Sequence, residues 1–119
     1  MARTTKKYKY IKLVDNLLIS TSLESHRISL KNIFNEIKSI YRFSNNRLFL
    51  TIKFLDWENL AKAMFDDTYK KGGIFHLWGH SWVIEKQNEW KKLEQVLIYI
   101  SNHKNVSYLT NKELLNNTL

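Results

Sequence analysis

The sequence predicts an α/β fold, because helix-like and strand-like segments alternate through its second half. Apolar residues recur every three or four positions in the longer segments, and short runs rich in β-branched and aromatic residues lie between them. No repeat, low-complexity tract or linker signal divides the 119 residues. We therefore expect one structural unit, residues 1–119, in which helices cover a layer of parallel strands.

The first half of the chain carries the weaker patterns. Alternating apolar residues predict a strand at 8–13, and the small residues of 17–22 predict a loop after it. Ser29 is a suitable N-cap for an amphipathic helix over 30–41. The run 48–54 is rich in β-branched and aromatic residues, as expected of a buried strand.

The second half is more regular. Asp56 precedes an amphipathic segment that ends at Gly72 and Gly73, and this arrangement predicts a helix between them. Residues 74–80 then predict a strand that opens into a loop after His80.

A third helix is expected to start from Asn88 as its N-cap. Residues 106–109 predict one more short strand, and Asn111 is expected to cap a terminal helical turn. The third helix should turn its apolar stripe toward the core; this stripe consists of Trp90, Leu93, Val96, Leu97 and Ile100.

Charge and composition narrow the classes of partner. Nineteen Lys and Arg residues against 11 Asp and Glu give a net charge of +8, which favours weak association with anionic polymers. The lysines are spread through the chain and outnumber the arginines, so we expect no nucleic-acid partner. No cysteine is present to form a disulfide. No export signal and no apolar segment of about 20 residues occurs, so we expect a soluble chain of unknown compartment with no membrane partner.

The densest group of chemically distinctive residues lies in 72–82. This segment contains two histidines, two tryptophans and all three glycines of the chain. If its backbone is extended, His76, Trp78 and His80 share one face, because side chains two residues apart point to the same side. The carboxyl end of such a strand is where α/β folds place their sites. Gly79 would let the backbone turn or approach a ligand just before His80.

His80 is the stronger candidate for a general acid or base. It precedes the polar Ser81 where the predicted strand ends, whereas His76 reads more naturally as an interior histidine. A strand would hold the two imidazoles roughly 13 Å apart, and no third ligand accompanies them, so we expect no metal site from this pair. Asp66 and Asp67 read as a solvated helix end.

Residues 75–114, FHLWGHSWVIEKQNEWKKLEQVLIYISNHKNVSYLTNKEL, closely resemble the C-terminal end of bacterial polysaccharide deacetylases with the NodB homology domain, carbohydrate esterase family four. The opening Ala2–Thr5 resembles the stretch that follows the family's middle strand. The similar positions are His76, Trp78, Gly79, His80 and Ser81, then Trp90, Leu93 and Glu94, and finally Tyr108, Thr110, Asn111, Glu113 and Leu114.

The resemblance implies a partial, distorted β/α barrel and the hydrolysis of glycan N-acetyl groups by water bound to a divalent metal ion, zinc. In the family an Asp-Asp pair and a His-x-x-x-His motif supply the base and the metal ligands, and a histidine on a late strand is the acid. By position His80 matches that acid, with His76 the competing assignment. Trp78 and Trp82 are the expected walls of the sugar pocket.

The chain also departs from the family. It has no Asp-Asp pair at a strand end and no His-x-x-x-His motif beyond His76 and His80, and Val83 stands where the family has Glu. We expect the isolated chain to bind no metal and to be inactive. The expected partners are a polysaccharide and either an N-terminal half on a separate chain or a second copy. The alternative function is a noncatalytic glycan-binding or assembly module; nucleic-acid binding rests on charge alone.

Overall fold

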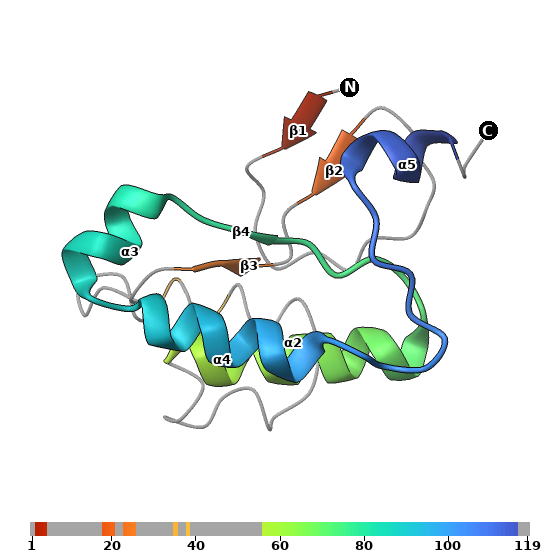
Figure 1. Cartoon of the computed structure of the whole chain (residues 1–119). Helices are drawn as coiled ribbons and strands as arrows, with labels where there is room; N and C mark the ends of the chain where they lie inside the picture. Colours follow the sequence, from red (N-terminus) through yellow and green to blue (C-terminus); the bar gives the residue numbers. More distant parts are fainter. Residues whose placement is uncertain are drawn as a thin grey trace.

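The computed structural model describes residues 2–4, 18–20, 23–25, 35, 38 and 56–116. Most of these residues are helical, and the strands are short (Figure 1). The elements follow one another in the order β1 (Ala2–Thr4), β2 (Leu18–Ser20), β3 (Leu23–Glu24), α2 (Trp57–Lys71), β4 (Leu77–Trp78), α3 (Ser81–Gln87), α4 (Trp90–Ile100) and α5 (Asn111–Asn116).

The strands form two parallel pairs. β1 pairs with β2, and β3 pairs with β4 so that Leu23 lies opposite Leu77 and Glu24 opposite Trp78. Parallel neighbours require a crossover connection, and α2 lies between β3 and β4 along the chain and contacts β3. Two such pairs occur in an open α/β layer as well as in part of a barrel, so the partial β/α barrel stays a prediction.

Helix α2 forms where the sequence predicts it. Asp56 is its N-cap, and the chain leaves the helix at Gly72, whose φ of 74° favours glycine. The buried residues recur at alternating steps of three and one, which places them on one face of the helix. They are Trp57, Leu60, Ala61, Met64, Phe65 and Thr68.

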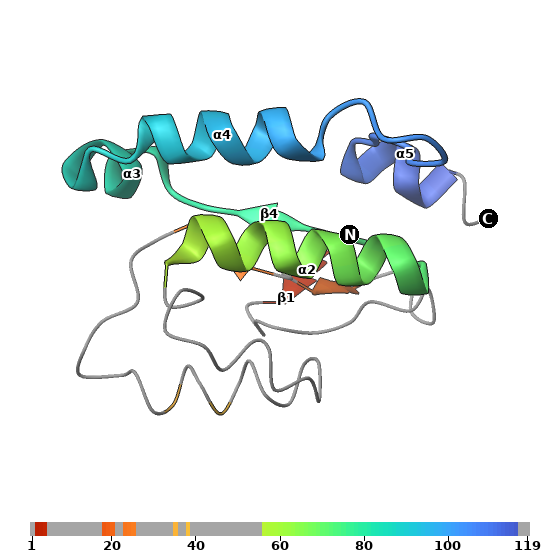
Figure 2. The same ribbon diagram turned by 90° about the horizontal axis from the view of Figure 1, so that it is seen from below.

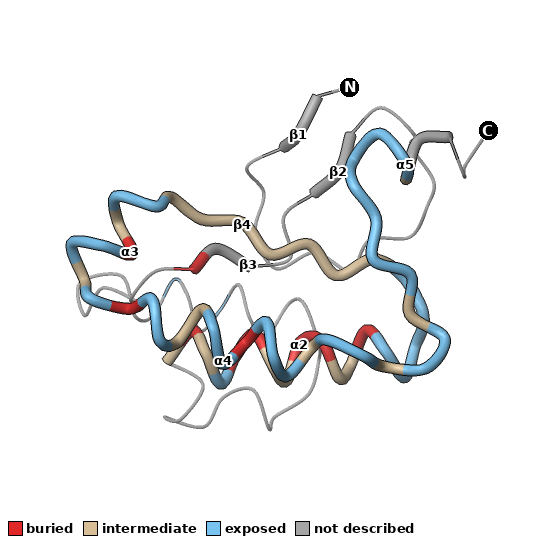
Figure 3. The backbone as a smooth tube through the Cα atoms, viewed as in Figure 1, coloured by how far each residue is buried: buried red, intermediate tan, exposed pale blue. Residues whose placement is uncertain are grey.

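The core lies between α2, α4 and β4. The two helices run in the same direction, side by side, on one side of β4 (Figures 1 and 2). Val96 of α4 is fully buried in the same cluster as the apolar face of α2. Figure 3 shows buried stretches along both helices. Partly buried residues complete the packing around them: Ala63, Phe75, Leu77, Leu93 and Ile100.

A buried carboxylate joins the two helices at the ends where they begin. Glu89, the N-cap of α4, is 2% exposed and accepts a 2.8 Å hydrogen bond from the Trp57 indole N–H. Lys92 Nζ lies 3.2 Å from the same carboxylate and also pairs with Asp56. Because the indole N–H and the ammonium satisfy it, Glu89 is tolerated in the interior, and it sets how α2 and α4 are aligned.

Several predicted elements in the second half are wrong in detail. The regular strand is confined to Leu77–Trp78, and the chain enters α3 directly after His80 instead of a loop. Residues 106–109 form no strand. Asn88, predicted as an N-cap, is the left-handed C-cap of α3 with φ 52°.

The predicted cap of the last helix is also wrong. Asn111 is its first residue, and Thr110 is the residue that caps it. The Thr110 hydroxyl accepts from the Glu113 N–H at 3.2 Å, and the Glu113 carboxylate accepts from the Thr110 N–H at 2.7 Å. This reciprocal pair is a capping box. The hydrogen bonds that Glu113 accepts from Thr110 lower the pKa of the Glu113 carboxyl. The bond from the Thr110 backbone N–H has the larger effect, and the bond from its hydroxyl the smaller.

In the first half, residues 18–20 form strand β2 where the sequence predicted a loop, because they pair with β1. Asn35 and Lys38 are helical and exposed, as expected of the polar face of the predicted 30–41 helix. The predicted strands at 8–13 and 48–54 lie outside the described residues.

We expect Glu89→Ala to lower the free energy of unfolding by about 1–3 kcal/mol, because it leaves a buried indole N–H without its acceptor. Glu94→Ala on the exposed face of the same helix is the matched control and should change stability by less than about 0.5 kcal/mol. Urea unfolding followed by circular dichroism measures both. Equal effects of the two substitutions would contradict this role of Glu89.

Stability should also fall at alkaline pH. Partial burial lowers the pKa of Lys92, but hydrogen bonds to Asp56 and Glu89 and their charges outweigh it and raise the pKa above its ordinary 10.5. The ammonium therefore stabilises the fold at every pH below 10.5, and this contribution is lost as pH rises through the raised pKa. Desolvation and the hydrogen bond to Asp66 raise the pKa of the Tyr99 hydroxyl. Ionisation of this hydroxyl at high pH therefore adds to the loss of stability.

The measurement is urea unfolding of the native chain and of Lys92→Met between pH 8 and pH 11.5. We expect the unfolding free energy of the native chain to fall more steeply above pH 10.5 than that of the variant, since only the native chain can lose the ammonium. If the unfolding free energies of the two proteins fell in parallel with pH, Lys92 would contribute nothing to the loss of stability at alkaline pH.

Candidate functional site

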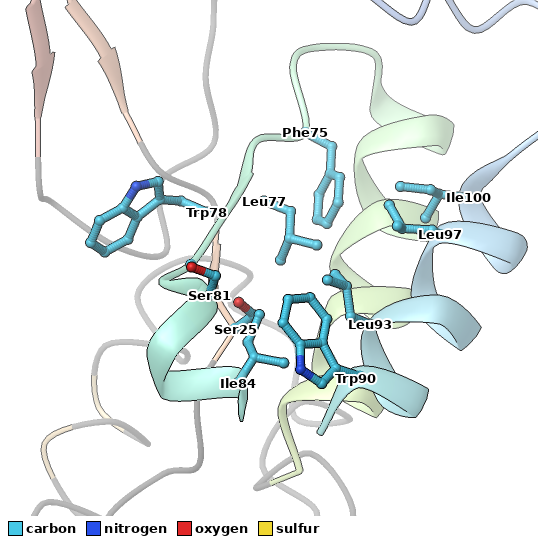
Figure 4. Close-up of a pocket in the computed structure, with 11 residues that line it drawn as sticks. Ser25, Phe75, Leu77, Trp78, Ser81, Ile84, Trp90, Leu93, Leu97 and Ile100 are labelled. Atoms are coloured by element: carbon cyan, nitrogen blue, oxygen red, sulfur yellow. The ribbon is translucent and has the colours of Figure 1, made fainter. Parts of the chain in front are cut away.

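Strand β4 has two different sides. Phe75 and Leu77 pack against the helical core, whereas the indole of Trp78 points away from it (Figure 4). This follows from the alternation of side chains along an extended backbone. The even-numbered positions predicted as a site therefore lie on the side of β4 that α2 and α4 leave open.

On that side His80 packs between two tryptophans. Its ring centroid lies 4.4 Å from that of Trp78 at an angle of 71°, and 4.2 Å from that of Trp82 at 29°. We call these three residues the Trp78–His80–Trp82 stack. Trp82 is 67% exposed and forms the outer wall. An imidazole held between two indoles is restricted in its ring orientation, and most of the Trp82 side chain beside it is accessible to solvent.

The stack depends on the junction of β4 and α3. The His80 carbonyl accepts the N–H groups of Val83 and Ile84 at 3.0 and 3.1 Å, so the helix begins immediately after the strand. That tight turn brings Trp82, in the first turn of α3, back over the His80 ring. A loop after His80, as the sequence predicted, would leave Trp82 unconstrained.

His76, the competing candidate, lies before β4, and its side chain is half-buried. Thus the structure brings together three of the four predicted site residues, and His76 lies at the other end of the strand. Nowhere among the described residues do three His, Asp or Glu side chains gather, so these residues alone do not fit a zinc site. The metal expected of a complete enzyme stays a prediction.

Glycine is required at position 79 because Ser25 lies too close for a side chain there. A Cβ on this residue would lie 1.8 Å from Ser25 Oγ and 3.2 Å from Ser25 Cβ. The Ser25 N–H donates to the Trp78 carbonyl at 2.7 Å, which extends the β3–β4 pairing and holds Ser25 in place. The sequence interpretation of Gly79 as a turn or ligand-approach residue therefore missed its actual neighbour, a serine far away in the sequence.

The opposite side of β4 borders a groove of about 400 Å³, which we call the β4–α4 groove (Figure 4). Two of the α4 residues predicted as core, Trp90 and Leu97, are 45% and 50% exposed here. The Trp90 indole N–H donates to Glu85, which ties α3 to α4 at one end. Among the described residues, the β4–α4 groove is lined by Ser25, Phe75, Leu77, Trp78, Gly79, Ser81, Ile84, Trp90, Leu93, Leu97 and Ile100.

His103 belongs to an aromatic cluster that the sequence did not predict. Its ring centroid lies 4.8 Å from Phe65, 5.5 Å from Tyr69 and 6.1 Å from Tyr99. The Tyr69 hydroxyl also donates to the Lys104 carbonyl at 3.1 Å. These contacts fasten the turn after α4 to the end of α2, which is a structural role.

The adjacent acidic pair is likewise structural. The Tyr99 hydroxyl donates one hydrogen bond shared between the two carboxylate oxygens of Asp66, each 2.9 Å away, and Asp67 pairs with Lys71 at 2.7 Å. Both carboxylates lie on α2, and neither follows a strand. Both lie before the last turn of α2 and are half-buried and paired, so the sequence interpretation of a solvated helix end is wrong in that detail.

The sequence matches no protein-family model, no curated protein and no solved structure. The likeness to polysaccharide deacetylases accordingly remains a prediction. Within the described residues, no helix combines the length and the apolar character needed to cross a bilayer.

The contact between Gly79 and Ser25 predicts a rescue. Gly79→Ala should destabilise the chain by about 1–3 kcal/mol, since its methyl group overlaps Ser25 while its backbone conformation is open to alanine. Ser25→Gly removes the overlapping atoms, so the double variant should be more stable than the sum of the single changes by at least about 1 kcal/mol. Urea unfolding of all four proteins measures the coupling, and additive effects would contradict the contact.

Proposed function

We propose that this chain supplies the proton-donating histidine and the sugar-contacting wall of a glycan N-deacetylase, and that it does not hydrolyse its substrate alone. The single observation that carries the proposal is the Trp78–His80–Trp82 stack on the open side of β4. The resemblance of residues 75–114 to polysaccharide deacetylases independently names the same three residues.

The geometry supports an acid role for His80 more than for His76. His80 lies at the carboxyl end of β4, and the two indoles restrict how its ring can rotate. A general acid must hold its proton within reach of one atom of the substrate. Here that atom is the amide nitrogen, which takes the proton as the C–N bond to the acetyl group breaks.

The exposed indole of Trp82 supports contact with a sugar. Pyranose rings present C–H groups on one face, and these pack on flat aromatic surfaces. Trp82 offers such a surface beside His80, so a sugar ring stacked there would hold its substituents close to the imidazole. The same exposure supports the second candidate, a noncatalytic glycan-binding module.

Activation of the attacking water is not assigned to this chain. The described residues gather no set of metal ligands, and Asp66 and Asp67 are engaged by Tyr99 and Lys71 on α2. The proposal therefore assigns to the chain binding of the glycan and delivery of one proton. Hydrolysis requires a partner that provides the nucleophile.

Binding tests the glycan-contacting role first. We expect N-acetylchitohexaose to bind the isolated chain in isothermal titration calorimetry, with an affinity unchanged by a chelator. Trp82→Ala should weaken binding roughly threefold to tenfold, the usual contribution of one aromatic contact. Trp90→Ala, an exposed tryptophan on the other side of β4, is the matched control and should have no effect. Absence of binding, or equal loss in both variants, would contradict the proposal.

Turnover separates the two candidates. The isolated chain with zinc should release no acetate from N-acetylchitohexaose; release would contradict the proposed division of labour. When the chain is co-expressed with a protein segment bearing the metal ligands and acetate is released, His80→Ala should lower kcat by ~10²–10⁴ with little change in KM. Loss of activity in His76→Ala with His80→Ala unaffected would reverse the assignment. Glycan binding without turnover in any such complex would favour the noncatalytic module.

A further inference from the structure

We propose that the β4–α4 groove is a second binding site, and that it takes one linear aliphatic chain with an oxygen-bearing end such as a fatty acid or fatty alcohol. The groove has Trp78 of the Trp78–His80–Trp82 stack among its lining residues, but its apolar body lies on the side of β4 that carries Phe75 and Leu77, so the inference does not rest on the proposed glycan chemistry.

The body of the groove is apolar. Its walls come from β4 and its flanking residues, from Ile84 of α3 and from one face of α4 (Figure 4). On α4 the lining residues recur at steps of three and four from Trp90 to Ile100, which spans about 15 Å and matches an extended chain of roughly ten carbons. Burial of an aliphatic chain there removes apolar surface of both partners from water.

One end of the groove is polar. Ser25 and Ser81 lie together at this end, away from Phe75 and Ile100 (Figure 4). Ser25 is 3% exposed, and its hydroxyl makes no hydrogen bond with any other described residue. A buried hydroxyl without a partner is unfavourable, and in native proteins such groups are satisfied by a ligand or by water.

That hydroxyl lies beside Gly79 at the polar end of the groove. Ser25 Oγ lies 1.8 Å from where a Cβ of Gly79 would point, on the side of the strand that faces the groove. A ligand oxygen at this end satisfies the hydroxyl while the aliphatic chain extends along α4. A sugar does not match the described lining, because its hydroxyl groups surround the ring, whereas the described side-chain hydroxyls of the groove, Ser25 and Ser81, lie at one end.

Isothermal titration calorimetry with sodium decanoate and with decan-1-ol, both below the concentration at which they aggregate, tests the site. We expect saturable binding of one molecule per chain. Leu97→Asp places a charge in the wall and should weaken binding at least tenfold, whereas Ile98→Asp should leave it unchanged, since Ile98 is 60% exposed and lies outside the groove. Both substitutions are at exposed positions of α4, and urea unfolding verifies that both variants fold.

The polar end is tested separately. Ser25→Ala should weaken binding of decan-1-ol roughly threefold to tenfold, the contribution of one neutral hydrogen bond. A higher affinity for decanoate than for decan-1-ol would identify the polar end of the ligand as a carboxylate, and the reverse would identify it as an alcohol. Both results support the site. The proposal is overturned by absence of saturable binding or by equal losses in the two Asp variants. It is also overturned if sedimentation shows a dimer that Leu97→Asp dissociates, since a second copy would then fill the groove.

Discussion

The alternation of side chains along β4 is the constraint on which the rest of the described structure depends. Phe75 and Leu77 pack into the core with α2 and α4, and this places Trp78, with His80 packed against it, on the side of β4 away from these two helices. Two surfaces of different chemistry thus lie back to back across one strand. The aromatic surface is suited to contact with a polar glycan, and the groove is suited to an apolar chain.

Contacts between helices α2 and α4 fix the positions of these two surfaces. Glu89 connects Trp57 of α2 to the start of α4, and Lys92 balances its charge. At the opposite ends, the Tyr99 hydroxyl bonds to Asp66. With both ends fixed, α4 cannot slide along α2 without breaking the buried Trp57–Glu89 hydrogen bond and the exposed Tyr99–Asp66 hydrogen bond, so these pairs hold the α4 wall of the β4–α4 groove in place.

Local patterns predicted helices α2 and α4 well. The bounds of α2 and the extent of α4 were predicted because periodicity and Gly72 act over a few residues, and tertiary packing reinforces them. Asn88 was misassigned because asparagine favours both N-caps and the left-handed C-cap. Helix α3 was missed because it is short and buries only Ile84.

Long-range features left no local signal. The approach of Ser25 to Gly79 arises from the pairing of β3 with β4, and the sequence does not specify which strands pair. For the site, the sequence predicted which residues share a side of β4. It did not predict that Trp82 returns over His80, since that contact requires α3 to begin immediately after His80.

The position of the His80 ring between the two indoles is the central claim, and proton NMR of the isolated chain tests it most directly. Ring currents of Trp78 and Trp82 should move the His80 imidazole protons well away from the shifts of a free histidine, with nuclear Overhauser contacts to both indoles. Trp82→Leu should remove most of the shift from that side. Imidazole protons at free-histidine shifts, without contact to either indole, would contradict the account.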